Sequence, residues 1–182
     1  SGLVPPRRDM EISFRYMLGM DSKAFKTLFG AIAEEKGFVR AFGGWFSESP
    51  ECIVVLDLQK SNFGNYYYLN FKVFVQGVFG NVYSKAKNLV KTEMGDVSCR
   101  QPSTFDDVLN LDADISKEDR ITKMRALFET FVIPISEKAK TLEGILSLGQ
   151  DSCVLLTQSV KAELQRLIGS AYAENEPPAS NA

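Results

Sequence analysis

Histidine is absent from this sequence of 182 residues. It is the usual general base near neutral pH and the commonest ligand of transition metals in proteins. Its absence excludes serine–histidine–aspartate triads, cysteine–histidine pairs and the H-E-x-x-H zinc site of metalloproteases. Acid–base chemistry by carboxylates or lysines stays open, as does Mg²⁺ held by carboxylates. The sequence therefore favours a protein that is not an enzyme, and we predict neither a cofactor nor a metal site.

Cysteine is scarce, with three residues that lie far apart and form no C-x-x-C pair: Cys52, Cys99 and Cys153. An odd number at such spacing argues against a disulfide framework and against a structural zinc site. A reduced, cytoplasmic setting is therefore expected. Long apolar runs are also missing, because no segment reaches the roughly 18 residues that a membrane span needs. We predict a protein that does not bind a membrane.

A basic stripe is missing too. The chain has 21 basic and 23 acidic residues, a net charge of −2. Nucleic-acid binding depends on clustered lysine and arginine, so we predict no nucleic-acid partner. Two local charge clusters are interpreted as solvated segments: the basic residues Lys85, Lys87 and Lys91, and the acidic residues Asp106, Asp107, Asp112 and Asp114. The acidic cluster lacks the spacing of an EF-hand loop.

The composition is that of one globular domain. Residues 1–19 begin with "SGLVPP", which resembles the remnant of a cleavable purification tag, and Met20 has the look of a natural start. We expect a single domain over 20–169. Residues 170–182 contain two prolines and small polar residues, so they are expected to form a flexible tail.

Helical spacing of apolar residues appears in four segments: 22–36, 116–132, 135–148 and 152–169. Asp21 or Ser22 is placed to cap the first helix, and Ser116 with Asp119 three residues later predicts a capping box for the second. Pro134 is expected to end or kink that helix. Gly169 is the predicted end of the last one.

Strand-like alternation appears over 38–47, 52–60 and 66–76, with a short edge strand at 96–101. Gly43 and Gly44 predict a bend in the first of these strands. The segment between the third strand and the edge strand predicts only a loop with a short helix. The fold class is therefore α+β, in which an N-terminal helix precedes an antiparallel meander of three to four strands, and C-terminal helices pack on one sheet face.

The register of the central hairpin follows from its loop. A four-residue loop at 62–65 brings the apolar residues of both strands onto one face only if Leu58 pairs with Leu69. The same register pairs Asp57 with Asn70 and Gln59 with Tyr68. The sheet is thus predicted to have an apolar face for the helices and a polar, aromatic face opposite.

The segments "GFVRAFGGWF", "ECIVVLDLQKSNFGNYYYLN" and "VSCRQP" carry a family resemblance. A helix ending in Gly37-Phe38, an aromatic strand, "LQKS" at 58–61 and the Tyr68-Leu69-Asn70 step resemble a bacterial family of domains of unknown function, number 4304. The resemblance covers about Met20 to Pro102. It implies a small α+β domain of bacterial or mobile-element origin, and it implies no reaction.

The candidate binding residues are Asp57, Gln59, Ser61, Tyr66, Tyr68, Asn70, Lys72, Arg100 and Trp45. Gln59, Ser61 and Asn70 offer neutral hydrogen-bonding groups on a sheet face, unless they bond only within the chain. Asp57 and Lys72 are placed to form an ion pair. Arg100 is suited to clamping a carboxylate, or to lowering the thiol pKa of its neighbour Cys99. Trp45 is either a core residue or an exposed anchor for a partner.

Two functions follow from these residues. The first is a non-enzymatic binding module whose polar-aromatic face takes a protein partner or a second copy of the chain, in an immunity-like or accessory role beside a mobile gene. The second is a small-molecule or nucleotide pocket closed by the C-terminal helices over Gln59, Tyr66, Tyr68, Asn70 and Arg100, with weak hydrolase or transferase activity. A partner surface is broad and open, whereas a ligand site is concave.

Overall fold

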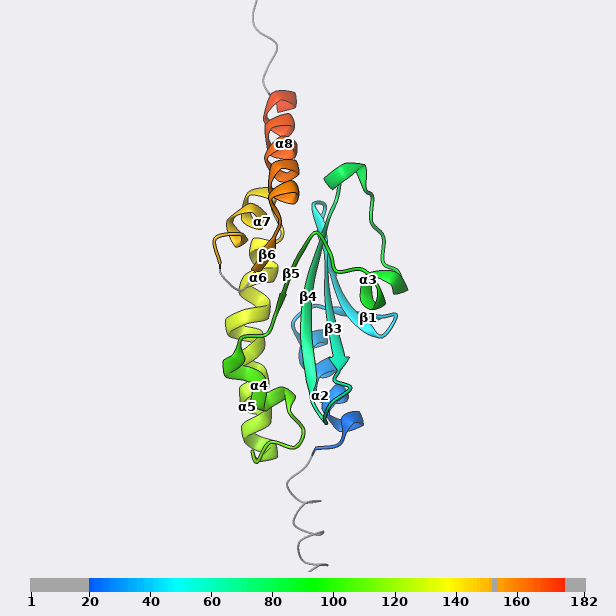
Figure 1. Cartoon of the computed structure of the whole chain (residues 1–182), viewed down its shortest axis with the longest axis vertical. Helices are drawn as coiled ribbons and strands as arrows, with labels where there is room; N and C mark the ends of the chain where they lie inside the picture. Colours follow the sequence, from blue (N-terminus) through cyan, green and yellow to red (C-terminus); the bar gives the residue numbers. More distant parts are fainter. Residues whose placement is uncertain (1–19, 152–153, 176–182) are drawn as a thin grey trace, which may run out of the picture.

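The computed structural model describes residues 20–151 and 154–175 (Figure 1). It contains an antiparallel sheet with helices on one side and a connecting segment on the other, so the α+β class predicted from the sequence is confirmed. The predicted tag remnant and Cys153 lie outside the described residues.

The sheet has six strands in sequence order, where three to four were predicted. They are β1 (Val39–Ala41), β2 (Gly44–Glu48), β3 (Cys52–Lys60), β4 (Tyr67–Val75), β5 (Val97–Arg100) and β6 (Val154–Leu156). Every neighbouring pair is antiparallel. The strands therefore form one continuous meander.

The predicted bend at Gly43 and Gly44 is instead a hairpin that joins β1 to β2. Ala41 pairs with Gly44, so Phe42 and Gly43 form a two-residue turn with φ angles of 52° and 82°. Positive φ at both positions is what a tight hairpin of this kind requires. Gly43 supplies this geometry without strain, and the pattern predicted as one bent strand is two short ones.

The second added strand, β6, lies where the sequence predicted the start of the last helix. It pairs with β5, so β5 is not the edge strand that was expected. The helix that follows, α8 (Gln158–Asn175), begins later than predicted and continues past Gly169.

The central hairpin has the predicted register. β3 and β4 pair Leu58 with Leu69, Asp57 with Asn70 and Gln59 with Tyr68. Because side chains alternate between the faces of a strand, this register puts the apolar residues on one face and the polar ones on the other.

The helices begin where their capping residues predict. α2 (Ser22–Glu35) is capped by the Asp21 side chain, which accepts from the amide of Ala24 at 2.7 Å. α5 (Lys117–Leu127) begins with the predicted capping box, in which Ser116 accepts from the amide of Asp119 and donates to its carboxylate. These bonds satisfy amides that the first turn of a helix leaves unpaired.

The remaining helical segments are short. They are η1 (Val78–Gly80), α3 (Lys87–Lys91), η2 (Ser103–Phe105), α4 (Asp106–Leu109), the π-helical turn η3 (Phe128–Val132), α6 (Ile133–Lys138) and α7 (Leu142–Leu148). Pro134 lies in the first turn of α6 and directly follows the π-helical turn η3, and the chain stays helical through it instead of ending there.

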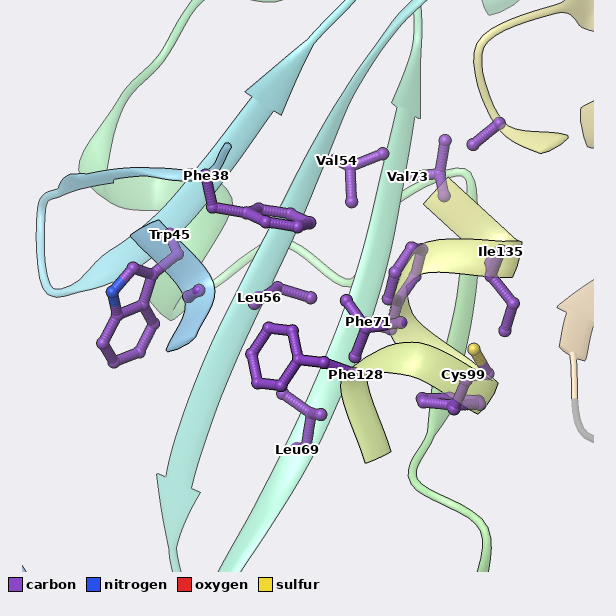
Figure 2. Packing of buried hydrophobic residues seen from close by; sticks show 14 of the residues in the cluster. Phe38, Trp45, Val54, Leu56, Leu69, Phe71, Val73, Cys99, Phe128 and Ile135 are labelled. Atoms are coloured by element: carbon purple, nitrogen blue, oxygen red, sulfur yellow. The ribbon is translucent and has the colours of Figure 1, made fainter. Parts of the chain in front are cut away.

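The main core lies between the sheet and the helices (Figure 2). Phe71 packs edge-on against Phe131, and Phe29 contacts both Trp45 and Phe128. Residues of α7 and α8 complete the same cluster through Ile145 and Leu164. The predicted packing of the C-terminal helices on one sheet face is therefore confirmed.

A second, smaller core covers part of the opposite face. Residues 76–96, called the connector below, carry α3 across this face (Figure 1). Leu89 and Val90 of α3 pack there with Phe46, Ile53, Val55 and Phe74 of the sheet. The sheet face that was expected to be open is therefore partly covered by the connector.

Candidate functional site

The part of this second face that the connector leaves uncovered lies at the other end of β3, β4 and β5. Its residues are Gln59, Tyr66, Tyr68, Asn70 and Arg100, called the tyrosine strip below. Gln59 and Arg100 are exposed, and the other three are partly buried. The strip therefore consists of five of the nine predicted site residues.

Asn70 is the centre of the strip. Its Nδ2 donates to Gln59 Oε1 at 3.0 Å and to Asp57 Oδ2 at 3.3 Å, while its Oδ1 accepts from Arg100 Nε at 3.2 Å. Because the Asp57 and Gln59 oxygens can only accept and Arg100 Nε can only donate, the side-chain amide of Asn70 must place its nitrogen toward β3 and its oxygen toward β5. Asn70 thus links three neighbouring strands and has no hydrogen-bonding atom left without a partner.

Arg100 extends across the strip from β5, where it pairs with Asn70 in register. Its guanidinium carbon lies 4.4 Å from the centre of the Tyr68 ring, a cation–π distance. Adjacent residues of a strand point to opposite faces, so Arg100 does not face the thiol of buried Cys99. The alternative in which Arg100 activates Cys99 is therefore not supported by the geometry.

Tyr66 and Tyr68 form an edge-to-face pair with ring centroids 5.3 Å apart. The Tyr68 hydroxyl donates to the Tyr66 hydroxyl at 3.2 Å. Hydrogen bonds from Ser61 and then Tyr68 lower the pKa of Tyr66, while donating to Tyr66 raises the pKa of Tyr68. Ser61 thereby joins the predicted site through Tyr66, at the end of the strip.

Asp57 and Lys72 were predicted on the open face, and the structure buries both. Their side chains are 10% and 9% exposed, and the carboxylate and ammonium lie 3.8 Å apart. The Lys72 ammonium donates to the carbonyl oxygens of Leu89 and Val90 at 3.3 and 2.7 Å. Burial lowers the pKa of Lys72, and the nearby charge of Asp57 opposes this shift. The pair therefore fastens α3 to the sheet and is not available to a partner.

Gly44 makes this close approach of α3 possible. It lies beside Asp57 in the sheet, and a Cβ built on it would come within 3.0 Å of Val90 Cγ2. Lys91, the next residue of α3, places its ammonium 3.9 Å from the other carboxylate oxygen of Asp57.

Trp45 is a core residue. It is 4% exposed, stacks at an angle on Phe29 and approaches Gly30 of α2. Of the two predicted roles, Trp45 therefore has the core position and is too buried to be a partner's anchor (Figure 2).

Phe63 is a surface residue that the sequence reasoning missed. It lies at the tip of the β3–β4 loop, beside the strip, and is 94% exposed. Its amide donates to the Ser61 hydroxyl at 3.1 Å. The available signal was an apolar ring inside "SNFGN", a turn segment that otherwise holds only polar residues and glycine.

Three of the four residues in the predicted acidic cluster bond to neighbouring side chains. Asp106 accepts from Gln101, Asp112 accepts from Asn65, and Asp107 pairs with Lys123. Within the described ranges, no three acidic or cysteine side chains are placed to hold a metal ion. None of the helices described is long and apolar enough to cross a bilayer.

A family model of a domain of unknown function, DUF4304, matches residues 29–138. The chain belongs to this family. The match runs past the segment that carried the resemblance and takes in α5, η3 and α6, whereas α7 and α8 lie outside it. No curated protein and no solved structure matched the chain.

Proposed function

We propose that this chain is a non-catalytic binding module that takes a protein partner on the tyrosine strip and on Phe63 beside it. One observation carries the proposal: Phe63 is 94% exposed in a loop whose next residue, Gly64, abuts the ring of Tyr66, at the end of a strip that holds two tyrosines and an arginine. Aromatic residues and arginine are the types enriched in the energetic centres of protein interfaces. Covering a side chain such as Phe63 stabilises a complex by about 1.5–3 kcal/mol.

The shape of the strip supports a partner surface over a small-molecule pocket. The C-terminal helices belong to the core on the opposite face, so they do not close over the strip as the second hypothesis required. A groove of about 430 Å³ lies elsewhere, between α2 and α5, and no strip residue lines it. Small ligands bind in concavities that bury most of their surface, whereas proteins dock on open faces.

The charges favour a different protein over a second copy of the chain. Arg100 is the only charged residue of the strip, while the chain as a whole has a net charge of −2. A two-fold dimer on this face would place the strip against itself, and the strip holds no negative charge that could pair with either Arg100. We therefore propose an immunity-like or accessory role, in which the partner is the product of a neighbouring gene in a mobile-gene setting.

Site-specific photo-crosslinking tests this function. A benzoylphenylalanine at position 63 is expected to crosslink one protein in the cells of origin, and the same probe at exposed Tyr172 on α8 is the matched control. The captured protein is then purified and titrated calorimetrically with the native chain and with Phe63→Ser and Tyr68→Ala. Truncating an interface anchor is expected to weaken binding by about tenfold.

Equal affinity of both variants and the native chain would exclude the strip as the docking surface. Crosslinking from Tyr172 alone would move the surface to α8. Light scattering on the purified chain separates a second copy from a different protein, because a concentration-dependent dimer lost in Phe63→Ser would make the partner the chain itself.

A further inference from the structure

We infer that Arg100 binds one carboxylate, the side chain of an aspartate or glutamate on the partner surface. This inference rests on the proposed function, since it names the chemistry that the partner presents to the tyrosine strip. It assigns a carboxylate ligand to Arg100, and it gives Asn70 and Tyr68 the role of positioning the guanidinium of Arg100.

The guanidinium of Arg100 is held before any ligand arrives. Tyr68 covers one face of it at 4.4 Å, and Asn70 Oδ1 accepts its Nε proton at 3.2 Å. Asn70 is itself fixed by Gln59 and by the buried carboxylate of Asp57. A side chain fixed by stacking and by one hydrogen bond loses less rotational freedom on binding than a free surface arginine does.

Arg100 is an exposed residue, and only its Nε is used within the described part of the chain. Neither terminal nitrogen has an acceptor among residues 20–151 and 154–175, although the Nε between them and the backbone is used. The two terminal groups present parallel N–H donors that match the two oxygens of a carboxylate. Within the described residues, the arrangement leaves both terminal nitrogens without an acceptor, while the ring of Tyr68 and the bond to Asn70 fix the plane of the guanidinium.

A carboxylate fits this site better than a phosphate does. Arg100 is the only charge in the strip, so it neutralises a single negative charge and leaves the second charge of a phosphate unbalanced. Terminal carboxylates of peptides are usually captured by backbone amides. Here the nearby amides of Leu69 and Gln101 already donate, to the Gln101 side chain and to the Leu69 carbonyl oxygen, so the match is to a side-chain carboxylate.

The test uses the ¹⁵N-labelled full chain and follows the arginine Nε–Hε signals by NMR at constant ionic strength. The probe is N-acetylglutamic acid amide, whose only charge is the side-chain carboxylate, and N-acetylglutamine amide is its neutral control. Arg100→Lys assigns the Arg100 signal by removing it. Exposed Arg40 on β1 reports any nonspecific response to ions.

We expect a saturable shift of the Arg100 signal with the glutamate derivative and none with the glutamine derivative. Asn70→Ala and Tyr68→Leu are each expected to weaken that binding by about threefold or more, because they release the guanidinium. A spectrum that otherwise superimposes on that of the native chain shows that each variant is folded.

The inference is overturned if both derivatives shift the Arg100 signal equally, if Arg40 responds as strongly as Arg100, or if inorganic phosphate binds more tightly than the glutamate derivative. Unchanged binding in both positioning variants would overturn their role. None of these results depends on finding the partner. The NMR experiment therefore tests the carboxylate site of Arg100, and the crosslinking experiment tests the docking surface independently of it.

Discussion

The ammonium of Lys72 lies 2.7 Å from the carbonyl oxygen of Val90, and this contact fastens α3 to the second face of the sheet. The same ammonium lies 3.8 Å from the Asp57 carboxylate, with both side chains almost fully buried. One lysine therefore offsets a buried negative charge and also satisfies backbone carbonyls at the end of a short helix.

Replacing Lys72 with methionine keeps the length of the side chain and removes its donors. We expect Lys72→Met to lower the free energy of unfolding by about 1–3 kcal/mol, because two carbonyl oxygens and Asp57 lose a partner. The matched control is Lys91→Met, whose half-exposed ion pair with Asp57 is worth about 0–1 kcal/mol. Urea unfolding of both variants measures the difference, and equal losses would show that burial of the Lys72 pair adds nothing.

The lowered pKa of Lys72 gives this comparison a pH dependence. Between the lowered pKa of the folded state and the ordinary value of the unfolded chain, the unfolded chain binds more protons at Lys72. The contribution of Lys72 to stability therefore rises with pH in that window. We expect the loss caused by Lys72→Met to be larger at the alkaline end of the window than at neutral pH, and unfolding curves over that range check the sign.

A Cβ at residue 44 would meet Val90 Cγ2 and the Leu56 carbonyl oxygen, each at 3.0 Å. Gly44→Ala is thus expected to destabilise the protein by about 1–3 kcal/mol through overpacking under α3. Adding Val90→Ala should recover part of the loss, since it removes one of the two clashing groups. Gly169→Ala on α8 is the control, because nothing lies within 4 Å and alanine favours a helix over glycine by about 1 kcal/mol.

The central hairpin was predictable from sequence, whereas the sheet edges were not. Side-chain alternation and loop length together allow only one register for Leu58 and Leu69 that gathers the apolar residues on one face. β1 and β6 hold three residues each, and runs that short fit strand and helix spacing equally well. Only pairing with a neighbouring strand decides between them, and that pairing is a contact between distant parts of the chain.

The same limit applies to the candidate site. The register placed Gln59 opposite Tyr68 and Asp57 opposite Asn70, as found. The burial of Asp57 and Lys72 depends on where the connector packs on the sheet. The sequence does not predict that position, because α3 is too short to show a helical pattern of its own. A five-residue helix held by tertiary contacts leaves little trace in local sequence.

Asn70→Asp tests whether the donors of the Asn70 amide hold the strip together. The new carboxylate would face the oxygens of Asp57 and Gln59, with no proton to share at neutral pH. We expect a loss of about 1–3 kcal/mol in unfolding free energy. Asn65→Asp is the matched control, because Asn65 donates to the carboxylate of Asp112 at 3.2 Å on the exposed surface. A loss in Asn65→Asp as large as in Asn70→Asp would contradict a special role of the Asn70 amide in holding the strip together.

The single tryptophan offers a spectroscopic check of the core. Trp45 is 4% exposed and lies between α2 and the sheet, so its fluorescence is expected at short wavelength and protected from iodide and acrylamide. Unfolding in urea should move the emission to longer wavelength and open it to both quenchers. Native emission that iodide quenches as in the unfolded chain would place Trp45 on the surface and restore it as a partner contact.

Phe63 separates stability from binding more cleanly than any strip residue. Its ring is 94% exposed, so Phe63→Ser is expected to change the free energy of unfolding by no more than about 0.5 kcal/mol. The same change should weaken partner binding by about tenfold, because the ring loses the contact area that docking would cover. Val82→Ser in the connector is the control: its side chain is 88% exposed, and it should leave both quantities unchanged. If Val82→Ser weakens binding and Phe63→Ser does not, the partner docks over the connector and not over the tyrosine strip.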